Sequence, residues 1–393
     1  MKHDRHWCRW LPLLTLSLLS TTAQGAKTDA HTQPGTVLSL DKGARGTPLP
    51  DAGENYLITY VSQSAAGLPV SVTGQIAIPR SPMPSGGYPV LSWASGTTGM
   101  GQQCAPSNMG GHTETLNEWV KRGYAVLRTD YPGWGDLGPR PLLNQRSNAS
   151  AVIDLVTAAH AVSDQLATDW IVAGHSEGGG AALWAAARDE ATQGRFQLKA
   201  AIALAPVGPG LLNMVRSVAN GVPIARDFPL MPEALAASLT ATTILGARAT
   251  DASIRVDDLV TEAFRPWLDA SAKACTTDPI TLPLPAVNQY LKLGTAYDRL
   301  ETFLSQQDPT TQTMRVPVWI AQAGADQFTP TPQTTAQMVN TLCARGGAIS
   351  LTPYPGQDHS QVVTASLLDA LAFADATVAG SPLSYNACDT HKP

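Results

Sequence analysis

The hydrophobic pattern predicts short buried strands that alternate with helices. Apolar, partly β-branched runs that end in loops predict strands at 88–96, 124–135, 170–173, 199–206, 316–326 and 348–359. Amphipathic or Ala- and Leu-rich stretches predict helices at 113–123, 147–166, 177–188, 331–343 and 364–376, with Ser147 as the cap of the second. Two earlier runs, 56–64 and 69–79, predict an antiparallel pair joined by a turn at Gly67. The pattern indicates an α/β fold whose mostly parallel sheet has helices on both faces.

The alternation stops between Pro206 and Met314, where helical stretches replace the strand pattern. We read this segment as a helical cap or lid inserted into an α/β core. The predicted division of the chain is a signal peptide at 1–25, an N-terminal extension at 26–54, a core at 55–206 and 315–380, a cap at 207–314, and a C-terminal tail at 381–393.

The first residues are typical of a cleavable signal peptide. Lys2, Arg5 and Arg9 precede an apolar run at 11–19 that is too short to span a bilayer stably, and cleavage is expected after Gly25. Losing three positive charges and one negative charge changes the formal net charge from −5 to −7. We therefore expect a secreted or periplasmic protein without a transmembrane segment.

Composition excludes some function classes. Hydrophobic residues make up 44% of the chain and charged residues 15%, without a basic cluster, so neither a disordered protein nor a nucleic-acid-binding protein is expected. Beyond Cys8 of the signal, four cysteines remain: Cys104, Cys275, Cys343 and Cys388. In an exported chain they favour disulfides, in any of three pairings, and their wide spacing disfavours a metal site.

Gly174-His175-Ser176-Glu177-Gly178 joins a predicted strand to a predicted helix. The serine is either an exposed nucleophile or a simple helix cap. Its setting resembles the nucleophile turn of the α/β-hydrolase fold, and the resemblance extends over residues 55–380. It implies Ser176 as the nucleophile, followed along the chain by an acid and then a histidine. His175 and Glu177 are interpreted as residues that only fill the turn.

The acid and the base are expected in loops after the last two strands. His359 follows the final predicted strand, whereas His112 and His160 precede the serine. Asp326 follows the strand before it, 33 residues ahead of His359, and would hold the imidazole in its productive tautomer. Asp358 and Asp308 are the alternatives, the first an adjacent turn residue and the second at the end of the insertion.

An oxyanion hole requires two N–H donors. We expect them from Glu177, directly after the nucleophile, and from Thr97 in the Gly-rich loop that follows the strand at 88–96, with Thr98 beside the substrate. The same loop contains GTTGMG, which lacks the spacing of a dinucleotide-binding motif.

Together, the SWASGTTGMGQQCAPS loop, the GHSEGG turn, the insertion and the spread of cysteines resemble the secretory lipase family, which includes fungal lipase A-like enzymes and related bacterial esterases. The resemblance implies the disulfides Cys104–Cys275 and Cys343–Cys388, a lid over an acyl pocket, and Asp130 and Tyr131 at the pocket floor or in a structural turn. The chain departs from bacterial relatives at Ser95, where they tend to have histidine.

The sequence thus predicts a serine carboxylic-ester hydrolase that needs no metal or organic cofactor and acts on a small-molecule or lipid ester. A serine peptidase or amidase on the same fold and a non-catalytic binding module are the alternatives. Acyl chain length, contact with a lipid interface and oligomeric state are left open.

Overall fold

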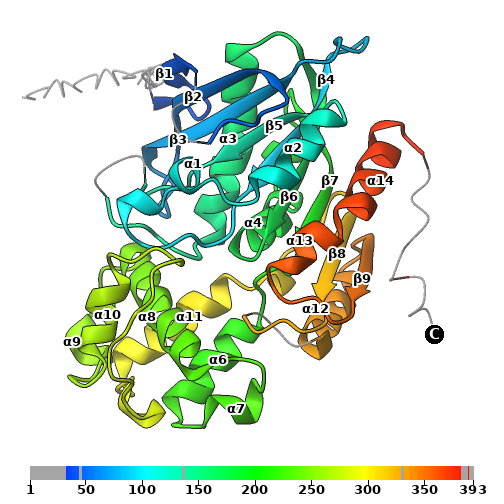
Figure 1. Ribbon diagram of the computed structural model, residues 1–393. Coiled ribbons are helices and arrows are strands. Elements are labelled where there is room, and N and C mark those ends of the chain that lie inside the picture. Colours follow the sequence, from blue (N-terminus) through cyan, green and yellow to red (C-terminus); the bar gives the residue numbers. More distant parts are fainter. Residues whose placement is uncertain (1–31, 44–46, 135–137, 329–331, 382–387, 389–393) are drawn as a thin grey trace, which may run out of the picture.

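A nine-stranded sheet forms the centre of the protein (Figure 1). The computed structural model describes residues 32–43, 47–134, 138–328, 332–381 and 388. The predicted signal peptide and most of the predicted C-terminal tail therefore lie outside the described residues. No helix in the described ranges is both long enough and apolar enough to cross a membrane.

The strands are β1 (Val37–Lys42), β2 (Ala52–Gln63), β3 (Pro69–Pro79), β4 (Tyr88–Ala94), β5 (Ala125–Thr129), β6 (Leu166–His175), β7 (Gln197–Leu204), β8 (Val318–Ala323) and β9 (Ile349–Tyr354). Their order is β1-β2-β3-β5-β4-β6-β7-β8-β9. Pairs from β1 to β3 and the β3–β5 pair are antiparallel, and all others are parallel. The predicted α/β fold with a mostly parallel sheet is confirmed.

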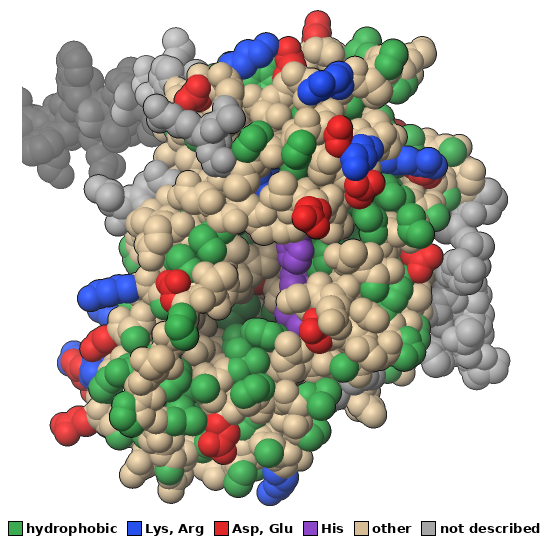
Figure 2. All heavy atoms as spheres, in the orientation of Figure 1, with side chains coloured by type: hydrophobic (Ala, Val, Ile, Leu, Met, Phe, Trp, Pro, Cys, Tyr) green, Lys and Arg blue, Asp and Glu red, His purple; other side chains and the backbone are tan. Residues whose placement is uncertain are grey.

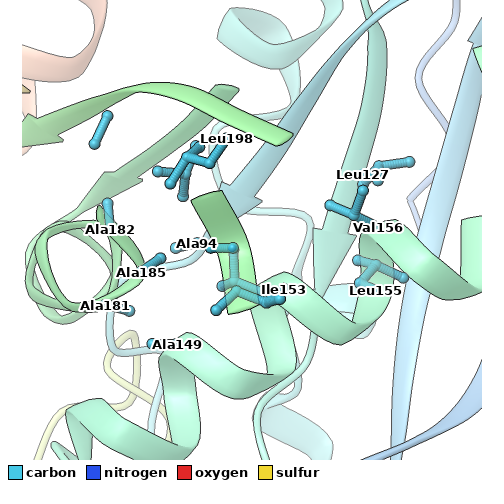
Figure 3. Packing of buried hydrophobic residues seen from close by; sticks show 14 of the residues in the cluster. Ala94, Leu127, Ala149, Ile153, Leu155, Val156, Ala181, Ala182, Ala185 and Leu198 are labelled. Carbon is cyan, nitrogen blue, oxygen red and sulfur yellow. The ribbon is translucent and has the colours of Figure 1, made fainter. Parts of the chain in front are cut away.

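Apolar helix faces cover both sides of the sheet. On one side lie α3 (Gln145–Val162), α4 (Glu177–Ala186) and α12 (Pro332–Ala344), whose buried residues form one cluster with the strands. Small side chains such as Ala149, Ala181 and Ala185 let α3 and α4 approach the sheet closely (Figure 3). On the other side lie α2 (Thr113–Lys121), α13 (Gln361–Ala365) and α14 (Leu367–Val378). Short helical turns complete the core: η2 (Gln102–Cys104), α1 (Pro106–Met109) and α5 (Asp189–Thr192).

Three details differ from the sequence prediction. Strand β1 lies in the segment predicted as an N-terminal extension, and its mostly exposed residues explain why no hydrophobic pattern predicted it. The cap of α3 is Asn144 rather than Ser147, because the Asn144 side chain accepts a hydrogen bond from the Ser147 N–H and the helix begins earlier. That helix also ends at Val162, and β6 begins at Leu166 instead of Trp170.

The segment between β7 and β8 consists mainly of helices (Figure 1). They enclose an apolar cluster that is separate from the clusters of the sheet. We refer to residues 207–314 as the cap, and its exact limits as a domain remain a prediction. Its elements are α6 (Gly210–Ala219), α7 (Ile224–Asp227), α8 (Glu233–Thr250), α9 (Val256–Leu259), α10 (Arg265–Ser271), η3 (Val287–Gln289), α11 (Thr295–Gln306) and η4 (Pro309–Thr311). The cluster shows that the cap buries apolar side chains of its own.

Parallel strands bring the site residues to one edge of the sheet. The loops that follow β4, β6, β8 and β9 all leave from the carboxyl ends of neighbouring parallel strands, and they carry Thr97, Ser176, Asp326 and His359. Ligand sites of open α/β sheets form at this edge.

The close approach of α4 to β4 makes a prediction about Gly178. A Cβ atom at Gly178 would lie 1.9 Å from the Ala94 carbonyl oxygen, so helix and strand would have to separate. We expect Gly178→Ala to lower the free energy of unfolding by about 3 kcal/mol or more, measured by urea unfolding. Gly111→Ala is the control, because nothing lies within 4 Å of its added Cβ. Equal stability of the two variants would contradict this packing.

The buried carboxyl group of Asp154 predicts a pH-dependent stability. Burial raises the pKa of Asp154 to about 7, although the Ser62 hydroxyl donates a hydrogen bond to it at 2.8 Å. In the unfolded chain this pKa is about 4. Between these values the folded state binds more protons, so its stability falls as the pH rises, by up to about 4 kcal/mol.

Asp154→Asn keeps the partner for Ser62 and cannot ionise. We expect urea unfolding curves between pH 4 and pH 8 to show a shallower loss of stability in this variant than in the wild type. Parallel pH profiles for the two proteins would refute the assignment.

Candidate active site

Ser176 occupies a strained turn between β6 and α4. Its backbone has φ 57° and ψ −118°, a conformation that residues other than glycine rarely adopt. The Ser176 N–H donates to the Leu204 carbonyl at 2.9 Å, and its carbonyl accepts from Val207 N–H at 2.9 Å and Gly180 N–H at 3.1 Å. These bonds hold the turn, and the half-buried serine lines a cavity between the core and the cap.

His359 and Asp326 form a buried hydrogen-bonded pair. Nδ1 of His359 lies 2.8 Å from Oδ2 of Asp326, and both side chains are at most 5% exposed. The other carboxylate oxygen accepts from the Phe328 N–H at 2.8 Å, and the Phe328 ring stacks on the imidazole at 4.8 Å. Since the carboxylate fixes the proton on Nδ1, Nε2 is left as the basic nitrogen.

The cavity brings Ser176 and His359 to the same space. Both line it, although no hydrogen bond joins the serine hydroxyl to the imidazole among the described residues. In hydrolases without substrate this contact is often long and tightens in the complex. The alternative acid Asp358 instead caps the turn that follows it, accepting from the N–H groups of Ser360 and Gln361, and Asp308 caps η4.

Two further histidines lie near His359: His175 packs against it, and His112 packs against His175. The His175 ring packs 4.5 Å from the His359 ring, and its Nε2 donates to the His359 carbonyl at 2.8 Å. The His112 ring meets His175 edge-on at 5.1 Å and lines the cavity. Burial lowers the pKa of His175 well below its ordinary value and that of His112 to about 4, so both are neutral near pH 7.

Sequence reasoning treated His175 as a residue that fills the turn and His112 as the start of a helix. Only the folded chain shows that His175 fixes the backbone of His359, because the two residues are 184 positions apart.

The Gly-rich loop after β4, residues 95–100, is called the oxyanion loop here. The backbone N–H groups of Thr97 and Glu177 donate no hydrogen bond to any residue that the structure describes. Thr97, Thr98 and Ser176 all line the cavity, and the Thr98 hydroxyl donates to the Cys104 carbonyl at 2.5 Å. The arrangement leaves two N–H groups beside the serine that can stabilise an anionic oxygen.

The cavity has a volume of about 500 Å³ (Figure 2). Figure 2 shows a hollow between the core and the cap, with histidine side chains and hydrophobic side chains around it. Its apolar lining includes Met109, Leu142, Leu143 and Phe328 from the core and Val207, Leu211, Leu235, Leu239 and Ile280 from the cap. A space of this size and lining suits a small, largely apolar ligand.

A known protein family matches most of this chain. The sequence profile described as "Serine aminopeptidase, S33" matches residues 107–362, which include Ser176, Asp326 and His359. The chain belongs to this S33 hydrolase family.

This member of the S33 hydrolase family is also similar in structure to a known lipase and a known esterase. Lipase A of Candida antarctica superposes with a TM-score of 0.72 at 17% identity, over 90% of this chain and 85% of that one. The rice cell wall degrading esterase LipA of Xanthomonas oryzae gives a TM-score of 0.67 at 19% identity, over 88% and 97%. A putative hydrolase of Legionella pneumophila gives 0.70 at 15%, over 88% and 100%. At these identities the likeness shows the α/β-hydrolase fold, and no curated protein matches by sequence.

Asp130 and Tyr131 of this S33 hydrolase do not line the cavity. Asp130 is fully buried and accepts hydrogen bonds from the Ser107 N–H at 2.8 Å and the Ser107 hydroxyl at 2.6 Å. The Tyr131 hydroxyl donates to the Ser95 carbonyl at 2.8 Å. Tyr131 therefore supports the oxyanion loop from behind, and Asp130 holds α1. Neither residue forms a pocket floor, and their roles fit the structural-turn alternative.

Two disulfides are present, Cys104–Cys275 and Cys343–Cys388. This is the pairing that the family resemblance implied. The first joins the segment after the oxyanion loop to the cap, where the Met100 N–H also donates to the Ala274 carbonyl at 3.1 Å.

The strain at Ser176 predicts an unusual stability order. Glycine adopts this conformation freely, whereas alanine keeps the strain of about 1–3 kcal/mol, which exceeds the entropic cost of glycine of about 0.5–1 kcal/mol. We expect Ser176→Gly to be more stable than Ser176→Ala by about 1 kcal/mol in urea unfolding. The reverse order would mean that the turn is not strained in solution.

Proposed function

We propose that this S33 hydrolase is an exported carboxylic-ester hydrolase that uses Ser176, His359 and Asp326 as a catalytic triad. The observation that carries the proposal is the strained serine in the same apolar cavity as a buried, hydrogen-bonded His–Asp pair. A non-catalytic binding module has no use for such a turn, because strain of this kind is kept where it serves a mechanism.

In this mechanism Nε2 of His359 takes the proton of the Ser176 hydroxyl as its oxygen attacks the ester carbonyl carbon. The Thr97 and Glu177 N–H groups stabilise the resulting oxyanion. His359 then gives the proton to the departing alcohol, leaving an acyl-enzyme, and water releases the acid by the same steps. Asp326 stabilises the imidazolium that forms twice in each cycle.

The lining of the cavity favours an ester over the free amino terminus of a peptide. An aminopeptidase has to hold a charged ammonium group, which needs a carboxylate partner once it is removed from water. Among the described residues that line the cavity, Asp278 is the one carboxylate, and it is exposed and accepts a hydrogen bond from the Cys275 N–H at 2.7 Å. The rest of the wall is apolar, with hydroxyl and imidazole groups between, and suits an acyl chain.

The C. antarctica and X. oryzae neighbours are named as a lipase and an esterase, which agrees with this choice. Two disulfides are compatible with an oxidising compartment and support export, together with the signal-like sequence at 1–25.

We expect the purified protein to hydrolyse 4-nitrophenyl butyrate, and Ser176→Ala to lower kcat by about 10⁴–10⁶-fold because the nucleophile is lost. A fluorophosphonate probe should label the wild type at Ser176 and leave the folded Ser176→Ala variant unlabelled. Absence of both labelling and ester hydrolysis would favour the binding module.

The substrate class is tested by matched pairs. The butyrate ester is compared with the corresponding 4-nitroanilide and with leucine 4-nitroanilide, and acyl length is varied up to emulsified triacylglycerol with and without detergent. Faster hydrolysis of the leucine anilide than of every ester would replace the esterase proposal by the aminopeptidase.

A further inference from the structure

The Glu177 side chain lies behind the oxyanion loop, away from the cavity, and is fully buried. Its carboxylate accepts four hydrogen bonds, from Thr97 Oγ1 at 2.9 Å, Arg140 Nη2 at 2.7 Å, the Leu143 N–H at 2.8 Å and Asn148 Nδ2 at 3.0 Å. The donors come from three separate segments: the oxyanion loop, the 140–143 segment and α3. A single side chain next to the nucleophile therefore ties these segments together.

Arg140 contacts the oxyanion loop at a second point. Its Nη1 donates to the Gly99 carbonyl at 2.9 Å while Nη2 holds Glu177, and the guanidinium lies over the Trp134 ring at 3.8 Å. The side chains of Arg140 and Glu177 are at most 1% exposed. The pair thus forms hydrogen bonds with the loop on both sides of Thr98, at the Thr97 hydroxyl and at the Gly99 carbonyl.

We propose that Glu177 and Arg140 form a clamp that positions the Thr97 N–H for the oxyanion. The clamp rests on the proposed function, since it acts through one of the two oxyanion donors. The Thr97 hydroxyl donates its hydrogen bond to the Glu177 carboxylate, so it positions the loop and does not itself bind the oxyanion. Glu177 contributes its N–H to the oxyanion and its side chain to the loop.

A purely structural role is the alternative. A buried ion pair adds little stability compared with apolar residues of the same shape, because both charges lose their hydration. A role in positioning the loop explains why the pair contacts it at two points, the Thr97 hydroxyl and the Gly99 carbonyl. The two roles predict different effects of a small change in the clamp. If the clamp positions the loop, kcat falls; if it only stabilises the fold, the free energy of unfolding falls and kcat does not change.

Thr97→Val is the decisive variant. Valine keeps the shape and the backbone N–H and removes only the hydroxyl that Glu177 holds. We expect kcat for 4-nitrophenyl butyrate to fall by about 10–100-fold with little change in KM, because a small displacement of an oxyanion donor weakens only transition-state binding. The Ki of a boronic acid that adds to Ser176 should rise by the same factor. Thr97→Ser, which restores the hydroxyl, should recover the wild-type kcat.

The matched control is Thr240→Val. Thr240 is a buried threonine of α8 whose hydroxyl donates to the Ala236 carbonyl at 2.7 Å, and it does not line the cavity. We expect its kcat and Ki to equal those of the wild type. If Thr97→Val does not fold, Arg140→Lys is measured in the same way, since lysine keeps the charge but cannot hold Glu177 and Gly99 together.

The outcomes separate the two proposals. A wild type without Ser176-dependent ester hydrolysis overturns the proposed function. An active wild type whose Thr97→Val variant keeps its kcat, or loses stability while kcat and Ki are unchanged, overturns the clamp. A fall in kcat matched by the rise in Ki, reversed by Thr97→Ser, supports it.

Discussion

The positive φ of Ser176 is the constraint on which the rest of the site depends. A residue with φ 57° cannot continue either the strand before it or the helix after it, so the hydroxyl of Ser176 is presented at the turn. Two small neighbours make this turn possible. A Cβ at Gly174 would lie 2.2 Å from the Gly178 carbonyl oxygen, and one at Gly178 would meet the Ala94 carbonyl oxygen.

Because α4 has to pass this close to β4, the loop after β4 lies beside the start of α4. Thr97 consequently lines the same cavity as Ser176, and the Glu177 N–H follows the serine directly along the chain. The strain of one residue and the packing of one helix thus place Ser176 beside the two N–H groups to which the proposed mechanism assigns the oxyanion.

Much of the fold could be predicted from the sequence, because buried parallel strands are continuous apolar runs and their loops are rich in glycine and polar residues. The runs before Ser176, Asp326 and His359 predicted that these residues would follow strands of one sheet, and the structure brings them to one edge of it. Edge strand β1 escaped prediction because its side chains are mostly exposed. The start of α3 was misplaced because Asn144 and Ser147 are equally good capping residues by type.

The supporting side chains could not be predicted in the same way. Glu177 and His175 flank Ser176, but their partners Arg140 and His359 are 37 and 184 positions away. No local pattern marks such pairs, since a charge or an imidazole in a loop is ordinary in a sequence. Asp130 illustrates the converse, because a carboxylate after a strand resembled a pocket residue and instead binds Ser107 in the interior.

The Cys104–Cys275 bond has a consequence for how a ligand can enter the cavity. It keeps the Cα atoms of the two residues 5.3 Å apart, and the Thr276 N–H donates to the Thr98 carbonyl at 2.9 Å on the same side of the cavity. Whatever displacement the rest of the cap undergoes, this corner cannot separate from the loop below it. The bond fixes this edge of the cavity, so the ester of the proposed function would have to enter between core and cap elsewhere along the rim.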